Sequence, residues 1–213
     1  RLSDNTFRFN PDGLSKQRTF SIVHGLDYTH SLGASSFYNL SLRENYFHYR
    51  DMAYDDVFDP RYDAAGQLKS DRDYELGAFV QGVDFTRFEQ TTDAFVAKGT
   101  YENQVTRDHH IKLGAEYQFT VLKFGHPGYL VYTTVPGQQQ QQLVRHVNDP
   151  PGYPGLAEYR PVVAAGFAQD EIEWNNLRLR GGLRFDFFDA RSELPGDLAN
   201  PANSIAGVPP VAP

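Results

Sequence analysis

Polar and apolar residues alternate along six long stretches of the chain, at 19–32, 36–51, 92–105, 110–124, 161–174 and 177–190. Alternation with a period of two places one face of a β-strand in an apolar medium and the other in a polar one. The stretches come in pairs, and each pair is joined by only a few residues, at 33–35, 106–109 and 175–176. The pattern predicts three β-hairpins whose strands are much longer than the soluble mean of ~5–6 residues.

Two long polar connections separate these hairpins, at 52–90 and 125–160. The first holds an acidic, aromatic segment and a candidate short strand at 77–88. The second is rich in Gly and Pro, and we predict that it is structureless. No apolar period typical of a helix extends over a long window. We expect 1–213 to be a fragment of a barrel domain, with a preceding loop at 1–18 and a truncated loop at 191–213.

Composition narrows the class of protein without naming it. The mean hydropathy is −0.54 and no long uninterrupted apolar stretch is present, which excludes a transmembrane helix. A transmembrane β-barrel tolerates low hydropathy, because only every second strand residue meets lipid. The absence of cysteine excludes disulfides and Cys-based zinc sites, and a net charge of −7 without a basic cluster argues against nucleic-acid binding.

These patterns predict an all-β fold, a partial antiparallel transmembrane β-barrel. We expect about six strands in an up-and-down meander with long outer loops. A lipid-facing Lys or Arg at mid-depth costs ~2–4 kcal/mol, so charged residues should face the lumen. The expected lumen-facing residues are Asn39, Ser41, Arg43, Lys112, Glu116, Gln118, Arg178, Arg180, Arg184 and Asp186. The lipid-facing register of 161–174 stays open. Candidates for an interfacial aromatic girdle near strand ends are Tyr28, Tyr38, Tyr46, Tyr101, Tyr117 and Trp174.

Candidate ligand and metal sites are few. His109 and His110 are adjacent in a strand, so their side chains should point to opposite faces and act as solvated turn residues. The carboxylates at Asp51, Asp55, Asp56, Asp59 and Asp63 lack the spacing of a calcium-binding EF-hand loop, and we expect a solvated acidic loop. Four loop tyrosines are candidates for stacking on a ligand such as a sugar: Tyr129, Tyr132, Tyr153 and Tyr159.

Catalytic chemistry has little support in the sequence. Glycosidases use paired carboxylates, and the chain offers Glu171, Glu173, Asp186 and Asp189. In a barrel strand these side chains should instead pair with the neighbouring Arg178, Arg180 and Arg184. No nucleophile elbow, phosphate loop or zinc-protease motif occurs. We therefore predict no enzyme, no catalytic residue, no cofactor and no metal.

Two segments resemble hairpins of TonB-dependent outer-membrane receptors. One is 110–117, and the other is 167–186, which carries Gln169-Asp170-Glu171 followed by Gly182-Leu183-Arg184-Phe185-Asp186. In that family a segment like Gln-Asp-Glu precedes a strand with Gly-x-Arg-[Tyr/Phe]-Asp. The segment at 58–62, Phe-Asp-Pro-Arg-Tyr, also resembles loops of the subgroup with an N-terminal carboxypeptidase-regulatory-like domain.

The resemblance implies a 22-stranded barrel around a plug, in the outer membrane of a Gram-negative-type bacterium. It implies uptake of bulky or scarce substrates such as iron chelates, cobalamin or glycans, powered by the TonB complex through the N-terminal part of the receptor. The implied partners are outer-membrane lipid, the remaining strands and plug, and the TonB complex, with no nucleic acid. We expect the chain to lack the plug and the TonB-contacting segment.

Two other protein classes remain open on the sequence. One is a passive porin-type barrel without a plug. The other is a soluble, secreted β-sandwich that binds carbohydrate, in which strands are shorter and a second sheet covers one face of the first. Strand length and the covering of the sheet faces distinguish the sandwich from a barrel.

Overall fold

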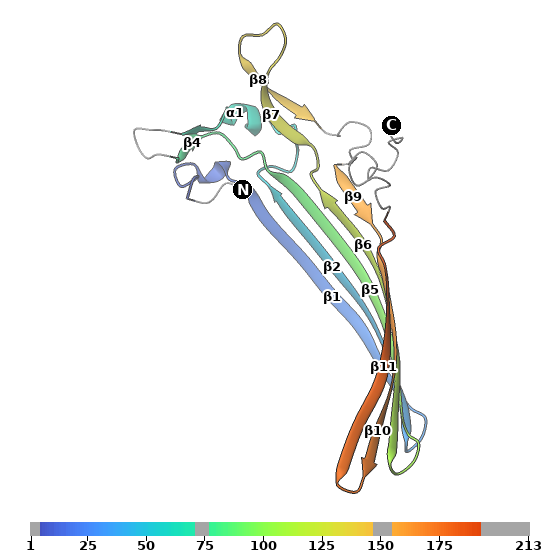
Figure 1. Cartoon of the computed structure of the whole chain (residues 1–213). Coiled ribbons are helices and arrows are strands. Elements are labelled where there is room, and N and C mark those ends of the chain that lie inside the picture. The colour runs from blue at the N-terminus through green and yellow to red at the C-terminus, as the bar shows by residue number, and fades with distance from the viewer. Residues whose placement is uncertain (1–4, 71–76, 147–154, 193–213) are drawn as a thin grey trace, which may run out of the picture.

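The computed structural model describes residues 5–70, 77–146 and 155–192, and six long strands dominate it (Figure 1). We call these strands the wall. They are β1 (Lys16–Ser31), β2 (Ser36–Met52), β5 (Arg87–Gln104), β6 (His109–Gly125), β10 (Val162–Trp174) and β11 (Leu177–Asp189). Their order in the sheet is β1-β2-β5-β6-β10-β11, and all neighbours are antiparallel. The prediction of an antiparallel meander forming part of a barrel is confirmed.

The wall strands are 13 to 18 residues long, as the extended alternation indicates. Two predicted strand starts were wrong. β1 begins at Lys16 rather than 19, and β5 begins at Arg87 rather than 92. Residues 87–91 have polar side chains on both faces, so alternation does not mark them. They nevertheless continue the ladder with β2, from Met52 opposite Arg87 to His48 opposite Thr91.

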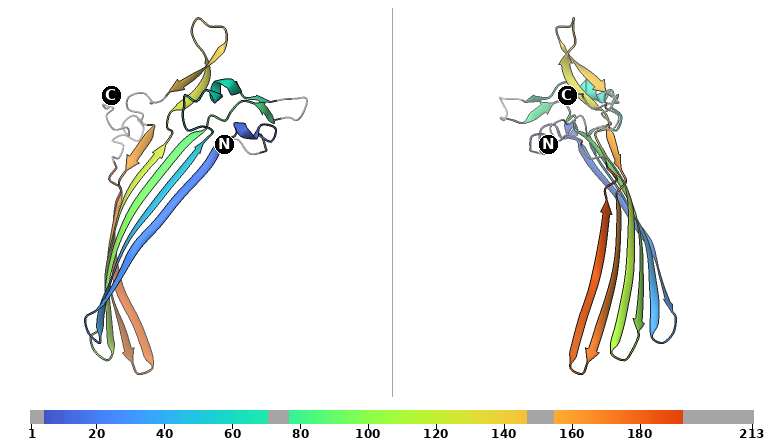
Figure 2. Two further views of the ribbon diagram at one scale, coloured as in Figure 1. Left: turned by 180° about the vertical axis from the view of Figure 1, so that it is seen from behind. Right: turned by 45° about the vertical axis from the view of Figure 1, so that its right-hand side comes forward.

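All three short turns lie at one end of the wall, and the longer connections lie at the other (Figures 1 and 2). The turns fall at the predicted positions, between β1 and β2, between β5 and β6, and between β10 and β11. The last turn has only two residues, and Asn175 has a φ of 50°. Two-residue hairpins need a residue with positive φ, and Asn accepts that conformation more readily than most residues.

The connections contain more structure than we predicted. The first holds α1 (Arg61–Ala65), β3 (Lys69–Ser70) and β4 (Phe79–Gln81), so only part of the candidate strand at 77–88 is separate from β5. The prediction of a structureless 125–160 was wrong. That segment forms a hairpin of β7 (Tyr129–Thr134) and β8 (Gln141–His146), and then β9 (Leu156–Tyr159).

β9 and β10 together act as one broken strand along β6. β9 pairs with Leu122–Gly125, and β10 pairs with residues 109–119 of β6. The break falls at 160–161, where the carbonyl of Pro161 accepts a hydrogen bond from the Thr120 N–H at 3.2 Å. At the N-terminus, a 3₁₀ turn at Pro11–Gly13 precedes β1. Of the predicted loop at 191–213, only Arg191 and Ser192 lie within the described residues.

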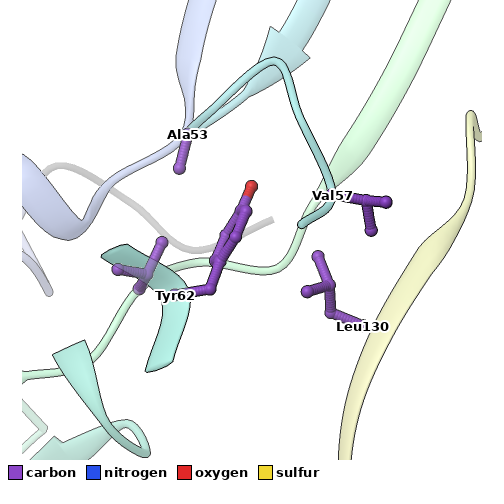
Figure 3. Close-up of a cluster of buried hydrophobic side chains, with 5 residues drawn as sticks. Ala53, Val57, Tyr62 and Leu130 are labelled. Atoms are coloured by element: carbon purple, nitrogen blue, oxygen red, sulfur yellow. The ribbon is translucent and has the colours of Figure 1, made fainter. Parts of the chain in front are cut away.

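The large fully buried apolar side chains lie outside the wall strands, in which the buried apolar residues are Met52, Ala94, Val162 and Ala165. One cluster comprises Ala53, Val57, Tyr62, Val83 and Leu130 (Figure 3). No second layer of the described residues covers either face of the wall (Figures 1 and 2). Strand length and the uncovered faces both argue against a sandwich. Neither helical segment in the described ranges is long or apolar enough to cross a membrane.

Candidate functional site: the two faces of the wall

The ten residues predicted to face a lumen lie on one face of the wall. Directly opposed residues in a sheet share a face. The register places Ser41 opposite Lys98, Lys98 opposite Glu116, and Asp186 in the same row across Ala165. The neighbouring rows add the remaining predicted positions to the same side. We call this the polar face, and its contact with a lumen stays a prediction.

A hollow of about 510 Å³ lies on the polar face, over β1, β2, β5 and β6. Predicted residues line it, including Asn39, Arg43 and Gln118. Asp27, Lys98 and Thr100 also line it but were not among the predicted set. The same alternation identifies them, because each stands directly opposite a predicted residue: Asp27 and Lys98 flank Ser41, and Thr100 is opposite Asn39. The hollow therefore combines hydroxyl, amide and charged groups of both signs.

Ion pairs connect the wall strands on the polar face towards the short turns. Lys112 approaches Glu102 at 2.8 Å across β5 and β6. Two arginines of β11 contact the carboxylate of Glu171 on β10. The Nε of Arg178 lies 3.0 Å from Oε1, and the Nε of Arg180 donates a hydrogen bond to Oε2 at 2.8 Å. We call this set, with His110 and Glu173, the ionic lattice. In this lattice Glu171 and Glu173 pair with arginines of β11, and Glu102 pairs with Lys112 and His110, as expected for a structural role.

The open register of 161–174 is resolved by these contacts. Glu171 and Phe167 lie on the polar face, and Asp170 and Ile172 lie on the opposite face. Phe167 stands opposite Gly114, and its ring occupies the space in which a Cβ at Gly114 would lie. Arg184 and Asp186 also pair, at 2.7 Å. Asp189 lies on the opposite face and approaches Arg191 at 3.8 Å.

The opposite face of the wall is apolar and open. Leu183 is 85 % exposed, Phe185 is 72 % exposed and Leu26 is 67 % exposed. Small residues fill the middle of this face, with Ala97 next to Tyr117 and Gly99 next to Ala115 in the register. So many large exposed apolar side chains on one surface are unusual for a soluble monomer and are typical of a surface that another apolar phase covers.

Polar side chains mark both ends of this apolar face. On β5 its limits are Asp93 and Asn103, and on β6 they are Lys123 and His109. Between these limits β5 and β6 carry no charged side chain on the apolar face. On the neighbouring strands the face does hold carboxylates, each with a histidine partner: Glu44 of β2 lies 3.0 Å from His24, and Asp170 of β10 lies 2.8 Å from His109. The ten residue steps from Asp93 to Asn103 span about 34 Å along the strand, or about 24–28 Å along the membrane normal at a tilt of 35–45°. A barrel's lipid-facing band is about 25 Å tall, so the dimensions agree.

The candidate girdle aromatics all lie on this apolar face. Tyr28 and Tyr38 contact each other near the turn end, with ring centroids 6.1 Å apart, and Tyr101 stands opposite Tyr38. Trp174, the last residue of β10, is 71 % exposed. Tyr117 lies in the middle of β6, so its expected position near a strand end was wrong.

The candidate ligand-binding tyrosines do not form a common stacking platform. Tyr129 stacks on His146 with centroids 4.2 Å apart, and Tyr132 stacks on Phe85 at 5.6 Å. Tyr159 stacks on Phe124 at 5.5 Å, whereas Tyr153 lies outside the described residues. Burial raises the pKa of Tyr132. The three described rings pack on partners within the chain.

The acidic segment is divided among separate cations. Arg50 approaches Asp55 at 2.7 Å, Arg61 approaches Asp59 at 2.6 Å, and Arg145 pairs with Asp63. Hydrogen bonds from Arg61 lower the pKa of Asp59 from 3.8 to about 2. Within the described residues, no three His, Cys, Asp or Glu side chains are placed to hold a metal ion.

The adjacent histidines point to opposite faces, as predicted from their position in a strand. On the apolar face, His109 Nδ1 lies 2.8 Å from an oxygen of Asp170. On the polar face, His110 lies 3.6 Å from Glu102. Each histidine therefore has its own carboxylate partner, and the two rings do not converge on one ligand.

The comparisons with known proteins agree with this geometry. Residues 1–205 match the family model described as TonB dependent receptor-like, beta-barrel. No curated protein and no solved structure gave a significant match. The family consists of outer-membrane receptors and transporters rather than enzymes. The subgroup suggested by 58–62 stays a prediction. With its long meander, its sorted faces and a family match over almost its whole length, the chain belongs to the TonB-dependent receptor β-barrel family.

Proposed function

We propose that this chain forms part of the wall of an active-transport receptor in the outer membrane of a Gram-negative-type bacterium. The complete receptor would take up a bulky or scarce substrate with energy from the TonB complex. The observation that carries the proposal is the apolar band on one face of β5 and β6, which holds no charged side chain and is limited by polar residues about 24–28 Å apart.

The sorting of side chains by face supports an orientation across the membrane. In hydrocarbon each charge on the lipid side costs ~2–4 kcal/mol at mid-depth. Lys98, Lys112 and Arg180 all lie on the polar face, which would line the lumen. The apolar face, with Leu183 and Phe185, would meet the acyl chains. The short turns would face the periplasm, and the connections would face outward, as is usual for such barrels.

The open edges of the wall support a larger assembly. β1 pairs only with β2 and β11 pairs only with β10 among the described strands. Backbone N–H and C=O groups exposed to lipid each cost several kcal/mol, so strands of the complete receptor would cover both edges. A plug inside the barrel would meet the polar face, and its presence would separate this proposal from a passive porin.

Spin labelling of the complete receptor in outer-membrane vesicles tests the orientation. A nitroxide is placed in turn at each position from 110 to 124 in β6. We expect oxygen, which dissolves in lipid, to relax the labels at odd positions such as 113 and 115. A water-soluble nickel chelate should relax the even positions. Equal accessibility at odd and even positions would contradict the proposed lipid-facing band.

A binding measurement tests the energy source. The purified periplasmic domain of TonB is titrated into the complete detergent-solubilised receptor and followed by calorimetry. We expect saturable binding, because an energised receptor must contact TonB. A barrel that spans the membrane by the spin-label test but gives no heat of binding would be a passive pore.

A further inference from the structure

We infer that the long connections form one rigid cap at the rim of the wall, and that Arg87 latches this cap to β5. The cap comprises residues 5–15, 53–70, 77–86 and 126–146. The inference concerns mechanical coupling and goes beyond the proposed transport function. The connections come from three different places in the chain and converge at the loop end of the wall (Figures 1 and 2).

A shared apolar core joins the connections. Tyr62 of α1 has no exposed surface, and its ring lies among Ala53, Val57 and Leu130 (Figure 3). Leu130 belongs to β7, about 70 residues further along the chain. Phe85 and Tyr132 stack across the same two connections. Because the core draws side chains from both connections, neither one can leave it without exposing apolar surface to water.

Arg87 ties this core to the wall. It is the first residue of β5 and only 5 % exposed. Its Nη1 and Nη2 donate to the carbonyls of Tyr54 and Asp55, each at 3.0 Å, and its Nε donates to the carbonyl of Pro127 at 2.9 Å. One guanidinium therefore bonds both connections at once, a geometry that its planar fork of five donors allows.

Two more contacts surround the latch. Nη1 of Arg87 also donates to the Tyr62 hydroxyl at 3.3 Å, which joins the latch to the apolar core. His126 Nδ1 lies 2.5 Å from the carbonyl of Arg87, so the second connection also holds the backbone at this position. Leaving buried carbonyls without donors costs free energy, so losing Arg87 should loosen both connections together.

The N-terminal segment extends the cap. Phe7 is 1 % exposed and packs on Phe79, with ring centroids 5.2 Å apart. Asn10 Nδ2 donates to the carbonyl of Gly82 at 2.7 Å, and the Asp84 N–H donates to the carbonyl of Gly13 at 2.7 Å. Two surface contacts, Gln67 with Gln141 and Asp63 with Arg145, span the connections on the outside. The cap presents a preformed surface, which reduces the ordering cost of binding anything at the rim.

Hydrogen exchange in the complete receptor tests the latch. In Arg87→Met we expect amide exchange at 54–62 and 126–132 to rise together, by roughly 10- to 100-fold. Exchange in the wall strands β5 and β6 should not change. The matched control is Arg18→Met, which removes an exposed arginine from the same end of the wall. Arg87→Lys should behave like Arg87→Met, because an ammonium group cannot reach all three carbonyls. A rise in one segment alone, or in neither, would overturn the inference.

A second measurement needs no change at Arg87. Spin labels at 64 and 133, which are exposed sites on α1 and β7, report the distance between the two connections by double electron–electron resonance. We expect a single narrow distance distribution in outer-membrane vesicles. Adding Arg87→Met, where that variant assembles, should broaden it. A broad distribution in the receptor with Arg87 intact would show that the connections move independently, and the rigid cap would be rejected.

Discussion

The wall and the cap differ in what covers their apolar side chains. In the cap, Tyr62 and Val83 are at most 2 % exposed, and they pack against side chains from other segments. In the wall, Leu183 and Phe185 are more than 70 % exposed. The cap behaves as a small globular core, whereas the wall relies on a second phase to cover it. Mutations in the cap should therefore act through the loss of internal packing, and mutations in the wall through contact with the surrounding apolar phase.

The largest effect should come from emptying the cap core. We expect Tyr62→Ala to destabilise the cap by ~3–5 kcal/mol, because it removes a fully buried ring. Limited proteolysis of the receptor in vesicles should then cut within 53–65, while the wall strands remain protected. The control is Tyr117→Ala, which removes a 45 % exposed tyrosine from the apolar face. Equal loss of protection in both variants would mean that the regions are not distinct.

A charge in the apolar band should have the next largest effect. We expect Ala115→Arg to cost ~2–4 kcal/mol, because it places a guanidinium against lipid near the middle of β6. Its control, Gln118→Arg, places the same side chain on the polar face. The fraction of heat-modifiable, folded barrel on unheated SDS gels measures assembly. Normal assembly of Ala115→Arg would contradict the assignment of this face to lipid.

A smaller effect should follow from filling the space at Gly114. Its added methyl group would collide with the Phe167 ring on the polar face, so we expect Gly114→Ala to cost ~1–3 kcal/mol. The temperature at which the folded band is lost in SDS should fall. Gly99→Ala is the control, because its methyl group would meet Leu40 at an ordinary 3.5 Å. An unchanged melting temperature for Gly114→Ala would show that Phe167 moves aside freely.

The smallest effect should be the acid response of α1. The Arg61 contacts lower the pKa of Asp59 to about 2, below its ordinary 3.8. The carboxylate therefore stabilises the folded cap fully above about pH 4, and this contribution disappears as the pH falls towards 2. Pepsin, which is active in acid, should cut near 54–62 faster at pH 2 than at pH 4. Because pepsin itself is more active at pH 2 than at pH 4, the ratio of the two rates is compared with the ratio for Asp59→Asn, which should be smaller. An equal ratio in the two proteins would assign the pH dependence to another group.

The ten polar-face residues were predictable because the signal is local. A charge such as Lys112 between Ile111 and Leu113 reveals its face from its two neighbours alone. The first strand of the last hairpin was ambiguous, since Phe167 and Asp170 each stand on the face opposite to the one expected for their polarity. Their placement depends on neighbours across the sheet. Phe167 covers Gly114, and Asp170 meets His109.

The cap was not predictable by the same means. Phe7, Val57, Tyr62 and Leu130 are scattered over more than 120 residues and follow no period. Arg87 stands in a polar stretch in which nothing distinguishes it from an exposed arginine. Only the antiparallel pairing of β2, β5 and β6 brings the ends of these connections together, and only then do the carbonyls of Tyr54 and Pro127 come within reach of one guanidinium.

The order of residues alone determined the strands, the short turns and the two sorted faces, because each depends on side chains one or two positions apart that meet different solvents. Tertiary structure decided the register of β10, the division of the acidic segment among separate cations, and the cap with its latch. These features depend on contacts between residues far apart in the chain. Such contacts have no period for a sequence to display, and they exist only once the wall has assembled.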